Sequence, residues 1–282
     1  MNIAVTASNG MLGREIIKTL KKLEPNHTII GLARSPEKAS DLGIEIRPGD
    51  YDNSDVLKTS LQGIDAVLLV SGKEEPAKRI QQHRNVIQAA KNAGVKKIVY
   101  TSIQGAESGT AFSPVVQSNR QTEQDIKESG LEWVIGRNGI YIEPDIEYID
   151  NYQKSGVVSN CAGDAKCGYT TRQELSFAYA KLLVEDKHYG NTYNLHGECI
   201  TQSQLVEYLN QAFGLSLSYQ TLSVEEYQQE RIAELGDFLG TIIAGIYKSI
   251  LDGYMDNTSD FLQAAGREHV GWEKYFMSLN KQ

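Results

Sequence analysis

The sequence predicts an α/β fold in which a doubly wound parallel sheet precedes a smaller, mostly helical lobe. Three features of the 282 residues lead to this prediction. Apolar segments typical of buried strands alternate with helical patterns through the first half of the chain. A turn of small residues joins the first strand to the first helix, and the alternation stops near residue 140.

The first strand, turn and helix indicate a phosphate-binding site. Residues 3–5 are typical of a buried strand, and apolar residues follow from Met11 at helical spacing. Free N–H groups and the positive dipole at the start of this helix suit a pyrophosphate. The small residues Ala7, Ser8 and Gly10 let backbone and phosphate approach closely. Ala7 replaces the first glycine of the usual pattern, so an ordinary strand-turn-helix is the alternative interpretation.

The next elements continue the alternation. We expect strands at 28–33, 44–47, 65–70, 97–101 and 131–135, and helices at 36–42, 54–61, 77–93 and 118–129. Six strands with crossovers predict a parallel sheet, whose ligands lie beyond the carboxyl ends of the strands. Those ends are Thr6, Ala33, Pro48, Val70, Thr101 and Gly136.

Two cations follow the second strand. An NAD site usually carries a ribose-binding carboxylate here, but this chain has Arg34, with Lys38 one helical turn later. Two positive charges suit the 2′-phosphate of NADPH. The alternative interpretation is that both are solvated charges before a surface helix.

From about residue 140 the pattern changes. The acidic and aromatic stretch 141–152 and the segment 155–168 predict a loop-rich region with small strands. Helices are expected at 174–184, 203–213, 223–235 and 238–254. The last is apolar on several faces, which is typical of a helix that covers a pocket, meets a partner or lies in a core. We therefore expect a dinucleotide-binding domain at 1–140 and a substrate or lid region at 141–282.

Composition narrows the functional classes. A net charge of −8 without a basic stripe argues against nucleic acid as a partner. The chain contains no apolar run of membrane-spanning length and no signal-like start, so we expect a cytoplasmic protein and no membrane partner. The three cysteines and five histidines lack metal-ligand spacing, so we expect no metal.

Several segments, in this order, resemble the NmrA-like group of atypical short-chain dehydrogenases/reductases, and within it the NADPH:quinone oxidoreductases. They are Thr-Ala-Ser-Asn-Gly-Met-Leu-Gly at 6–13, Ala-Arg-Ser-Pro-Glu-Lys-Ala at 33–39, Gly-Asp-Tyr-Asp at 49–52, Gln-His-Arg-Asn-Val-Ile-Gln-Ala-Ala-Lys-Asn-Ala-Gly-Val-Lys-Lys-Ile-Val-Tyr-Thr-Ser at 82–102 and Arg-Asn-Gly-Ile-Tyr at 137–141. The resemblance implies a Rossmann-type fold that binds NADPH.

The resemblance also assigns roles to residues. The pyrophosphate would lie against Thr6, Ala7, Ser8, Asn9, Gly10, Met11 and Leu12, and the 2′-phosphate against Arg34 and Lys38. The adenine edge would meet Asp50 and Tyr51, the ribose Val70, Ser71 and Gly72, and the nicotinamide side Thr101 and Ser102. Asn138 and Tyr141 would border the substrate pocket, although a loop-capping amide and a rim aromatic are equally consistent with the sequence.

One expected pair is absent. Ordinary members of the superfamily carry a Tyr and, four residues later, a Lys on the helix after the fifth strand, where they move a proton. Those positions fall near Val115 and Asn119, and neither can do so; Arg120 beside them stays protonated. A quinone needs no protein acid, because water can protonate its reduced product. We therefore expect an NADPH-dependent reductase of a small quinone-like acceptor, monomeric or homodimeric, with no assigned catalytic residue. The alternative is a catalytically silent NADP(H) sensor that acts on a protein partner.

Overall fold

The computed structural model describes residues 1–279, and a seven-stranded parallel sheet forms its centre. The strand order is β10-β6-β5-β4-β1-β2-β3. The strands are β1 (Asn2–Val5), β2 (Thr28–Ala33), β3 (Glu45–Pro48), β4 (Ala66–Val70), β5 (Lys97–Ile103), β6 (Glu132–Asn138) and β10 (Asn191–Leu195). The predicted doubly wound parallel sheet is confirmed.

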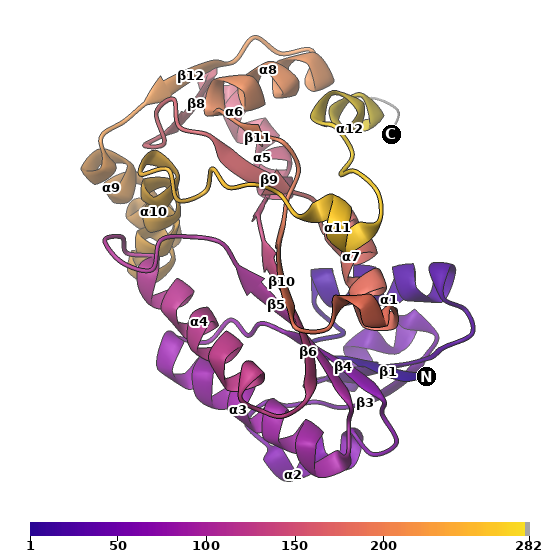
Figure 1. Ribbon diagram of the computed structural model, residues 1–282. Helices are drawn as coiled ribbons and strands as arrows, with labels where there is room; N and C mark the ends of the chain where they lie inside the picture. The colour runs from indigo at the N-terminus through magenta and orange to yellow at the C-terminus, as the bar shows by residue number, and fades with distance from the viewer. Residues whose placement is uncertain (280–282) are drawn as a thin grey trace.

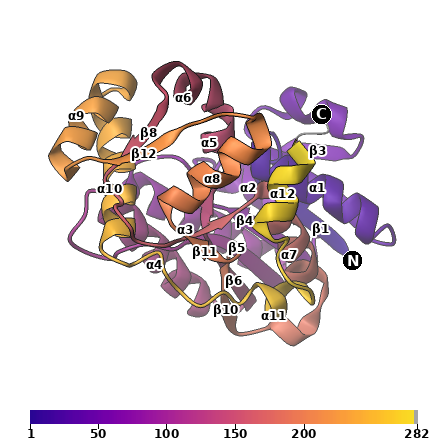
Figure 2. The ribbon, with the colours of Figure 1, turned by 90° about the horizontal axis from the view of Figure 1, so that it is seen from above.

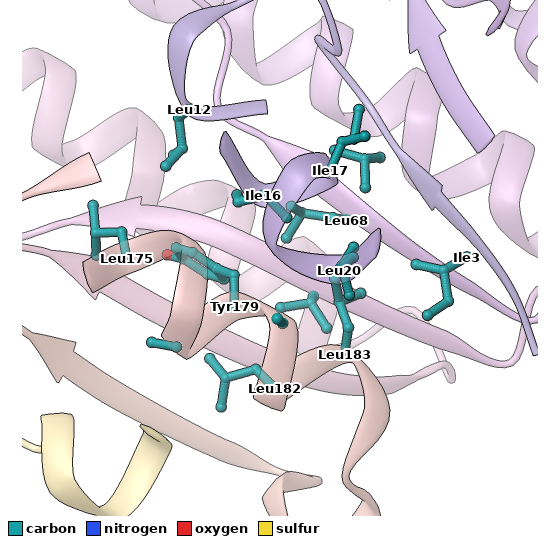
Figure 3. Packing of buried hydrophobic residues seen from close by; sticks show 14 of the residues in the cluster. Ile3, Leu12, Ile16, Ile17, Leu20, Leu68, Leu175, Tyr179, Leu182 and Leu183 are labelled. Carbon is teal, nitrogen blue, oxygen red and sulfur yellow. The ribbon is translucent and has the colours of Figure 1, made fainter. Parts of the chain in front are cut away.

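Helices cover both faces of the sheet (Figure 1). One face carries α1 (Met11–Leu23) and α7 (Arg172–Val184), and the other carries α2 (Ser54–Ser60), α3 (Pro76–Ala93) and α4 (Ser113–Lys127). The 3₁₀ helix η1 (Pro36–Leu42) joins β2 to β3. Side chains alternate along each strand, so that Ile3 and Val5 pack under α1 while Ala4 faces the α3 side. Figure 3 shows the packing between α1, α7 and the sheet, with Ile16, Leu20 and Tyr179 inside it.

The remaining chain forms the C-terminal lobe, which stands over one end of the sheet (Figures 1 and 2). Its helices are α5 (Glu143–Glu147), α6 (Ile149–Ser155), α8 (Gln202–Phe213), α9 (Val224–Leu235), α10 (Asp237–Leu251) and α12 (Trp272–Leu279). Two small sheets contain β7 (Ile140–Tyr141), β9 (Cys167–Thr170) and β11 (Cys199–Ile200), and β8 (Val157–Asn160) with β12 (Ser218–Thr221). The 3₁₀ helix η2 (Asp186–His188) precedes β10, and α11 (Phe261–Ala265) packs on α7.

Three expectations about elements are wrong. Strand β10 was not predicted, because it is an edge strand with mostly polar, half-exposed residues and lacks an apolar run. Helix α4 begins at Ser113 rather than near residue 118, and Pro114 in its first turn is the start signal. Much of 141–152 is helical rather than loop, since α5 and α6 are short and show no apolar periodicity.

The strand order places the topological switch point of the sheet between β1 and β4. β1 lies between β2 and β4, so chain connections leave it in opposite directions on either side. Ligands of doubly wound sheets bind outside the carboxyl ends of the strands at such a switch point. β4 ends at Val70 as predicted, and β1 ends at Val5, one residue before the predicted Thr6.

Candidate functional site

The turn after β1 is held in an unusual backbone conformation. Ala7 has a φ of +48°, and it is the one non-glycine residue of 1–279 with a positive φ. Its carbonyl oxygen accepts a hydrogen bond from the Gly10 amide at 2.8 Å. A Cβ on Gly13 would lie 2.5 Å from the same oxygen, so this position must stay glycine for the helix to pack on the turn. Ala7 therefore adopts the left-handed geometry that the replaced glycine would favour.

The N-terminus of α1 is open. Within residues 1–279 no side chain caps it, and its first turn carries no acidic residue. Side chains cap α2, α3, α7, α8 and α9, whereas in the described part of the chain α4, α5, α6, α10 and α11 lack such a cap, as α1 does. Asn9, Gly10 and Met11 are exposed there, with 63% of Met11 accessible. The free amides and the dipole at this end suit an anion.

Other residues of the turn face inward. Ser8 is fully buried, its amide donates to the Leu32 carbonyl at 3.0 Å, and its hydroxyl has no partner within residues 1–279. Leu12 packs in the apolar core beneath α1. Thr6 is also fully buried. The part of the turn that can meet a ligand is therefore the backbone from Asn9 to Leu12, except for the Gly10 amide, which already donates to the Ala7 carbonyl.

A hydrogen-bonded group joins β1 to the loop after β4. The Thr6 hydroxyl lies 2.5 Å from the Tyr51 hydroxyl and accepts from the Val70 amide at 2.9 Å. The Tyr51 hydroxyl donates to the Val70 carbonyl at 2.8 Å. Burial raises the pKa of Tyr51 well above its usual value, so the hydroxyl stays protonated. The Tyr51 hydroxyl therefore forms its hydrogen bonds within the protein. Of the two residues predicted at the adenine edge, Asp50 is the more accessible.

Side chains from two further elements hold the next two amides of this loop. The Ser71 amide donates to Thr101 Oγ1 at 2.9 Å, and the Gly72 amide donates to His83 Nε2 at 3.0 Å. Burial lowers the pKa of His83 to about 3, so the ring is neutral and its proton sits on Nδ1, 2.9 Å from Thr122 Oγ1. Because its amides are used internally, the loop 70–72 can offer a ligand mainly carbonyl oxygens, which suit ribose hydroxyls. His83 was not predicted as part of the site, although it lies within the motif at 82–102.

The two predicted 2′-phosphate ligands lie in the open. Arg34 and Lys38 are exposed, and neither forms a salt bridge in the described part of the chain. Arg14 on α1 bonds the Lys38 carbonyl and pairs with Asp41 at 2.7 Å, which fastens η1 to α1. Sequence reasoning missed Arg14, for which the only signal was a cation directly after Gly13.

At the end of β5, the hydroxyl of Ser102 is engaged by a buried ionic cluster. It donates to Glu123 Oε1 at 2.6 Å. Glu123 also receives Arg137 Nη2 at 2.7 Å and Arg120 Nη1 at 2.9 Å. Arg120 is therefore an ion-pair partner of Glu123, and Thr101 is used by the loop after β4.

Val115 and Asn119, near which the sequence analysis expected a proton-transfer pair, lie in the first turns of α4. Asn119 is buried, and its Oδ1 accepts from the Tyr100 hydroxyl at 2.6 Å and from Ser71 Oγ at 3.3 Å. Its Nδ2 donates to the Val115 carbonyl at 2.8 Å. Asn119 thus supports the loop and strand next to it.

Asn138 and Tyr141 come together where β6 ends. Asn138 is buried, and its Nδ2 lies 3.4 Å from the Tyr141 hydroxyl. Burial raises the pKa of Tyr141 to about 12, so this hydroxyl keeps its proton. The Arg172 guanidinium lies 5.7 Å from the centre of the Tyr141 ring. Tyr179 on α7 donates to Asn138 Oδ1 at 2.6 Å, a partner that sequence reasoning missed.

Within residues 1–279 no group of three or more His, Cys, Asp or Glu side chains is arranged to hold a metal ion. None of the helices there combines the length and apolar character that a membrane crossing needs.

Comparisons with known proteins agree on the nucleotide. A family model described as NAD(P)H-binding matches residues 8–160. The chain is 36% identical over 229 residues to quinone oxidoreductase 2 of Escherichia coli, covering 80% of this chain and 79% of that protein. A crystal structure described as NADPH-dependent quinone oxidoreductase from E. coli, complexed with NADPH, has a TM-score of 0.86 at 32% identity over 98% and 99% of the two chains.

Two further relatives cover nearly the whole chain. An NmrA-like family domain-containing oxidoreductase of Aspergillus flavus is 28% identical, covering 96% of this chain and 92% of that one. The structure of a triphenylmethane reductase of Citrobacter sp. has a TM-score of 0.91 at 31% identity over 100% of both chains.

Proposed function

The chain belongs to the NAD(P)H-binding family and to its NmrA-like oxidoreductases, and on this premise we propose that it passes a hydride from NADPH to a quinone-like acceptor. That it is an NAD(P)H-dependent oxidoreductase follows from the family. The choice of acceptor is the proposal. The observation that carries it is the absence of a proton-transferring pair on α4, where Val115 and Asn119 stand.

In this proposal the cofactor binds at the switch point between β1 and β4. The uncapped start of α1 would bind the pyrophosphate through the backbone from Asn9 to Leu12. Arg34 and Lys38, which lack ion pairs within residues 1–279, would bind the 2′-phosphate. Asp50 would face the adenine, and the loop 70–72 the ribose. When bound, NADPH supplies a hydride at its nicotinamide ring, which would lie on the Thr101 side.

The acceptor would lie beside Asn138 and Tyr141. A quinone is already electrophilic, and its reduced form is a stabilised phenolate that water can protonate. The protein then has to position the ring and offer a hydrogen bond to the developing oxyanion. Tyr141 can do this because its raised pKa keeps the hydroxyl protonated. We also propose that the acceptor enters beneath the segment after residue 140, which would give the parts of 141–282 other than α7, β10 and α11 the role of a substrate lobe.

A steady-state assay tests the proposal. NADPH oxidation is measured with a panel of benzoquinones and naphthoquinones and with a matched panel of simple ketones. We expect turnover of quinones and negligible turnover of ketones, since only ketones need a protein acid. Tight NADPH binding with no acceptor reduced above background would favour the alternative of a redox sensor acting on a protein partner.

Triphenylmethane dyes are a second class of acceptor that the same assay can test. The triphenylmethane reductase structure matches this chain over its full length, and a triarylmethyl cation that accepts a hydride becomes neutral without any proton. A cationic dye and a quinone thus make the same demand on a site without an acid. If the protein decolourises a triphenylmethane dye with NADPH at a kcat/KM above that of every quinone, the proposed acceptor becomes a cationic dye instead of a quinone.

A further inference from the structure

The hydroxyl of Tyr179 lies at the point where β6 ends. Tyr179 is fully buried on α7, between the sheet and α1 (Figure 3). Its hydroxyl lies 2.6 Å from Asn138 Oδ1 and 3.0 Å from the Gly136 carbonyl oxygen. A Cβ on Gly136 would collide with this hydroxyl, so the glycine in the middle of β6 leaves the space that Tyr179 occupies.

The distance between the Tyr179 hydroxyl and Asn138 Oδ1 indicates which group donates the hydrogen bond. A separation of 2.6 Å is usual for O–H···O and short for N–H···O. Tyr179 therefore donates, and the oxygen of the Asn138 amide accepts. The amide nitrogen of Asn138 must then face the other way, toward the Tyr141 oxygen at 3.4 Å. Since Tyr141 accepts from Asn138, its own proton is free to point away from the protein amide.

We propose that Tyr179 is a positioning residue, which orients the Asn138 amide so that the Tyr141 hydroxyl presents its proton to the oxygen of the acceptor. The inference rests on the proposed function and adds a residue that touches neither cofactor nor substrate. Tyr141 donates a hydrogen bond in this arrangement, and no proton leaves it. Without the Tyr179 hydroxyl, the Asn138 amide can turn over. Its oxygen then accepts the Tyr141 proton and draws it away from the acceptor.

A double-mutant cycle tests the proposal in the full-length protein. The variants are Tyr179→Phe, Tyr141→Phe and the double variant. The first readout is kcat for a naphthoquinone with saturating NADPH. The second is the dissociation constant of the same naphthoquinone for the complex with NADP⁺, which cannot reduce it. The affinity for NADPH and the thermal unfolding midpoint are measured beside them.

We expect Tyr179→Phe and Tyr141→Phe to lose activity through the same hydrogen bond to the acceptor. Each single variant lowers kcat by about three- to tenfold, the effect of one hydrogen bond, and weakens quinone binding in parallel. The double variant is no worse than Tyr141→Phe, and NADPH affinity is unchanged in all three. Tyr169→Phe is the matched control. It also removes a fully buried hydroxyl, bonded to Gln202 at 2.8 Å, and should leave kcat as in the parent.

The other outcomes of the cycle separate an error in the positioning role of Tyr179 from an error in the proposed function. If Tyr141→Phe lowers kcat and Tyr179→Phe does not, or if the two losses multiply in the double variant, the positioning role is wrong and the proposed function stands. If Tyr179→Phe fails to fold, Asn138→Leu removes the orienting amide and gives Tyr141 no new acceptor, so its kcat must lie below that of the parent and above that of Tyr141→Phe. A kcat equal to that of the parent would overturn the positioning role. A parent protein that neither binds nor reduces a quinone overturns both proposals.

Discussion

Ala7 shows how one residue can carry strain at a binding site. Its φ of +48° is a conformation that side chains with a Cβ rarely adopt, and here it aims the carbonyl at Gly10. A methyl group is small enough for the turn to form. The sequence identified Ala7 as a departure from the glycine pattern, and the structure gives the physical consequence of that departure.

We expect Ala7→Gly to raise the free energy of unfolding by about 1 kcal/mol, because the left-handed conformation costs glycine nothing. NADPH should bind at least as well as in the parent. Ala233→Gly is the matched control, since Ala233 is exposed on α9 and the same change there should destabilise. Urea unfolding of both variants measures these changes. A lower free energy of unfolding in Ala7→Gly would contradict the claim that the backbone at Ala7 is strained.

Asp145 makes stability depend on pH. It is 6% exposed on α5, Tyr152 donates to it at 2.9 Å, and burial raises its pKa to about 6. The folded state thus holds this proton more tightly than the unfolded state does. Between the unfolded pKa, about 4, and the folded pKa, the unfolded chain ionises first, so stability falls as the pH rises through this window.

Asp145→Asn removes this ionisation and keeps an oxygen for Tyr152. At about pH 8 the variant should be more stable than the parent by up to about 3 kcal/mol, and near pH 4 the difference should vanish. Asp150→Asn, an exposed change on α6, should alter stability little at either pH. Urea unfolding at the two pH values measures this. A difference that is the same at both would show that Asp145 does not titrate as its burial implies.

At the scale of elements, α1 and η1 together form the cofactor end of the proposed site. Arg14 ties the carbonyl of Lys38 and the carboxylate of Asp41 to α1. The 3₁₀ helix is therefore fixed relative to the open helix N-terminus. The exposed Lys38 lies within this 3₁₀ helix and the exposed Arg34 lies two residues before it, so both cations of the proposed 2′-phosphate site are close to the fixed helix.

Arg34→Ala should weaken NADPH binding by about 1.5 to 3 kcal/mol, the value of a hydrogen bond to a charged group, and leave NADH binding nearly unchanged. Lys91→Ala, which removes an exposed cation at the end of α3, should affect neither cofactor. Calorimetric titration with both cofactors measures the two affinities. Equal losses for NADPH and NADH would remove the 2′-phosphate assignment.

The elements also show where sequence reasoning works and where it stops. Strands such as β2 were predicted to the residue, because buried parallel strands are continuous apolar runs. The edge strand β10 has no such run, since one side of it meets no strand. In the site, motif order placed Thr6, Val70 and Thr101 at the same edge. The burial of Ser8 and of the Tyr51 hydroxyl was not predicted. It depends on contacts between segments that are distant in the sequence, and local sequence patterns do not show such contacts.

At the scale of the whole molecule, the chain places two kinds of surface at one edge of the sheet. In the proposed site, amides of the first turn and carbonyls of the loop 70–72 would face the nucleotide. The segment that leaves β6 then carries Asn138 and Tyr141 into the C-terminal lobe, which covers that end of the sheet (Figure 2). Such a site can orient a ring and stabilise an oxyanion, and it contains no assigned acid. The account therefore predicts an acceptor that takes a hydride without a protein proton.

Anaerobic single turnover tests this claim most directly. The protein is saturated with NADPH and mixed with a naphthoquinone, and the decay of the nicotinamide absorbance is followed with unlabelled NADPH and with NADPH deuterated at the transferred position. The account predicts decay well above the enzyme-free rate, with a primary isotope effect. Tight NADPH binding with decay no faster than without protein would contradict it.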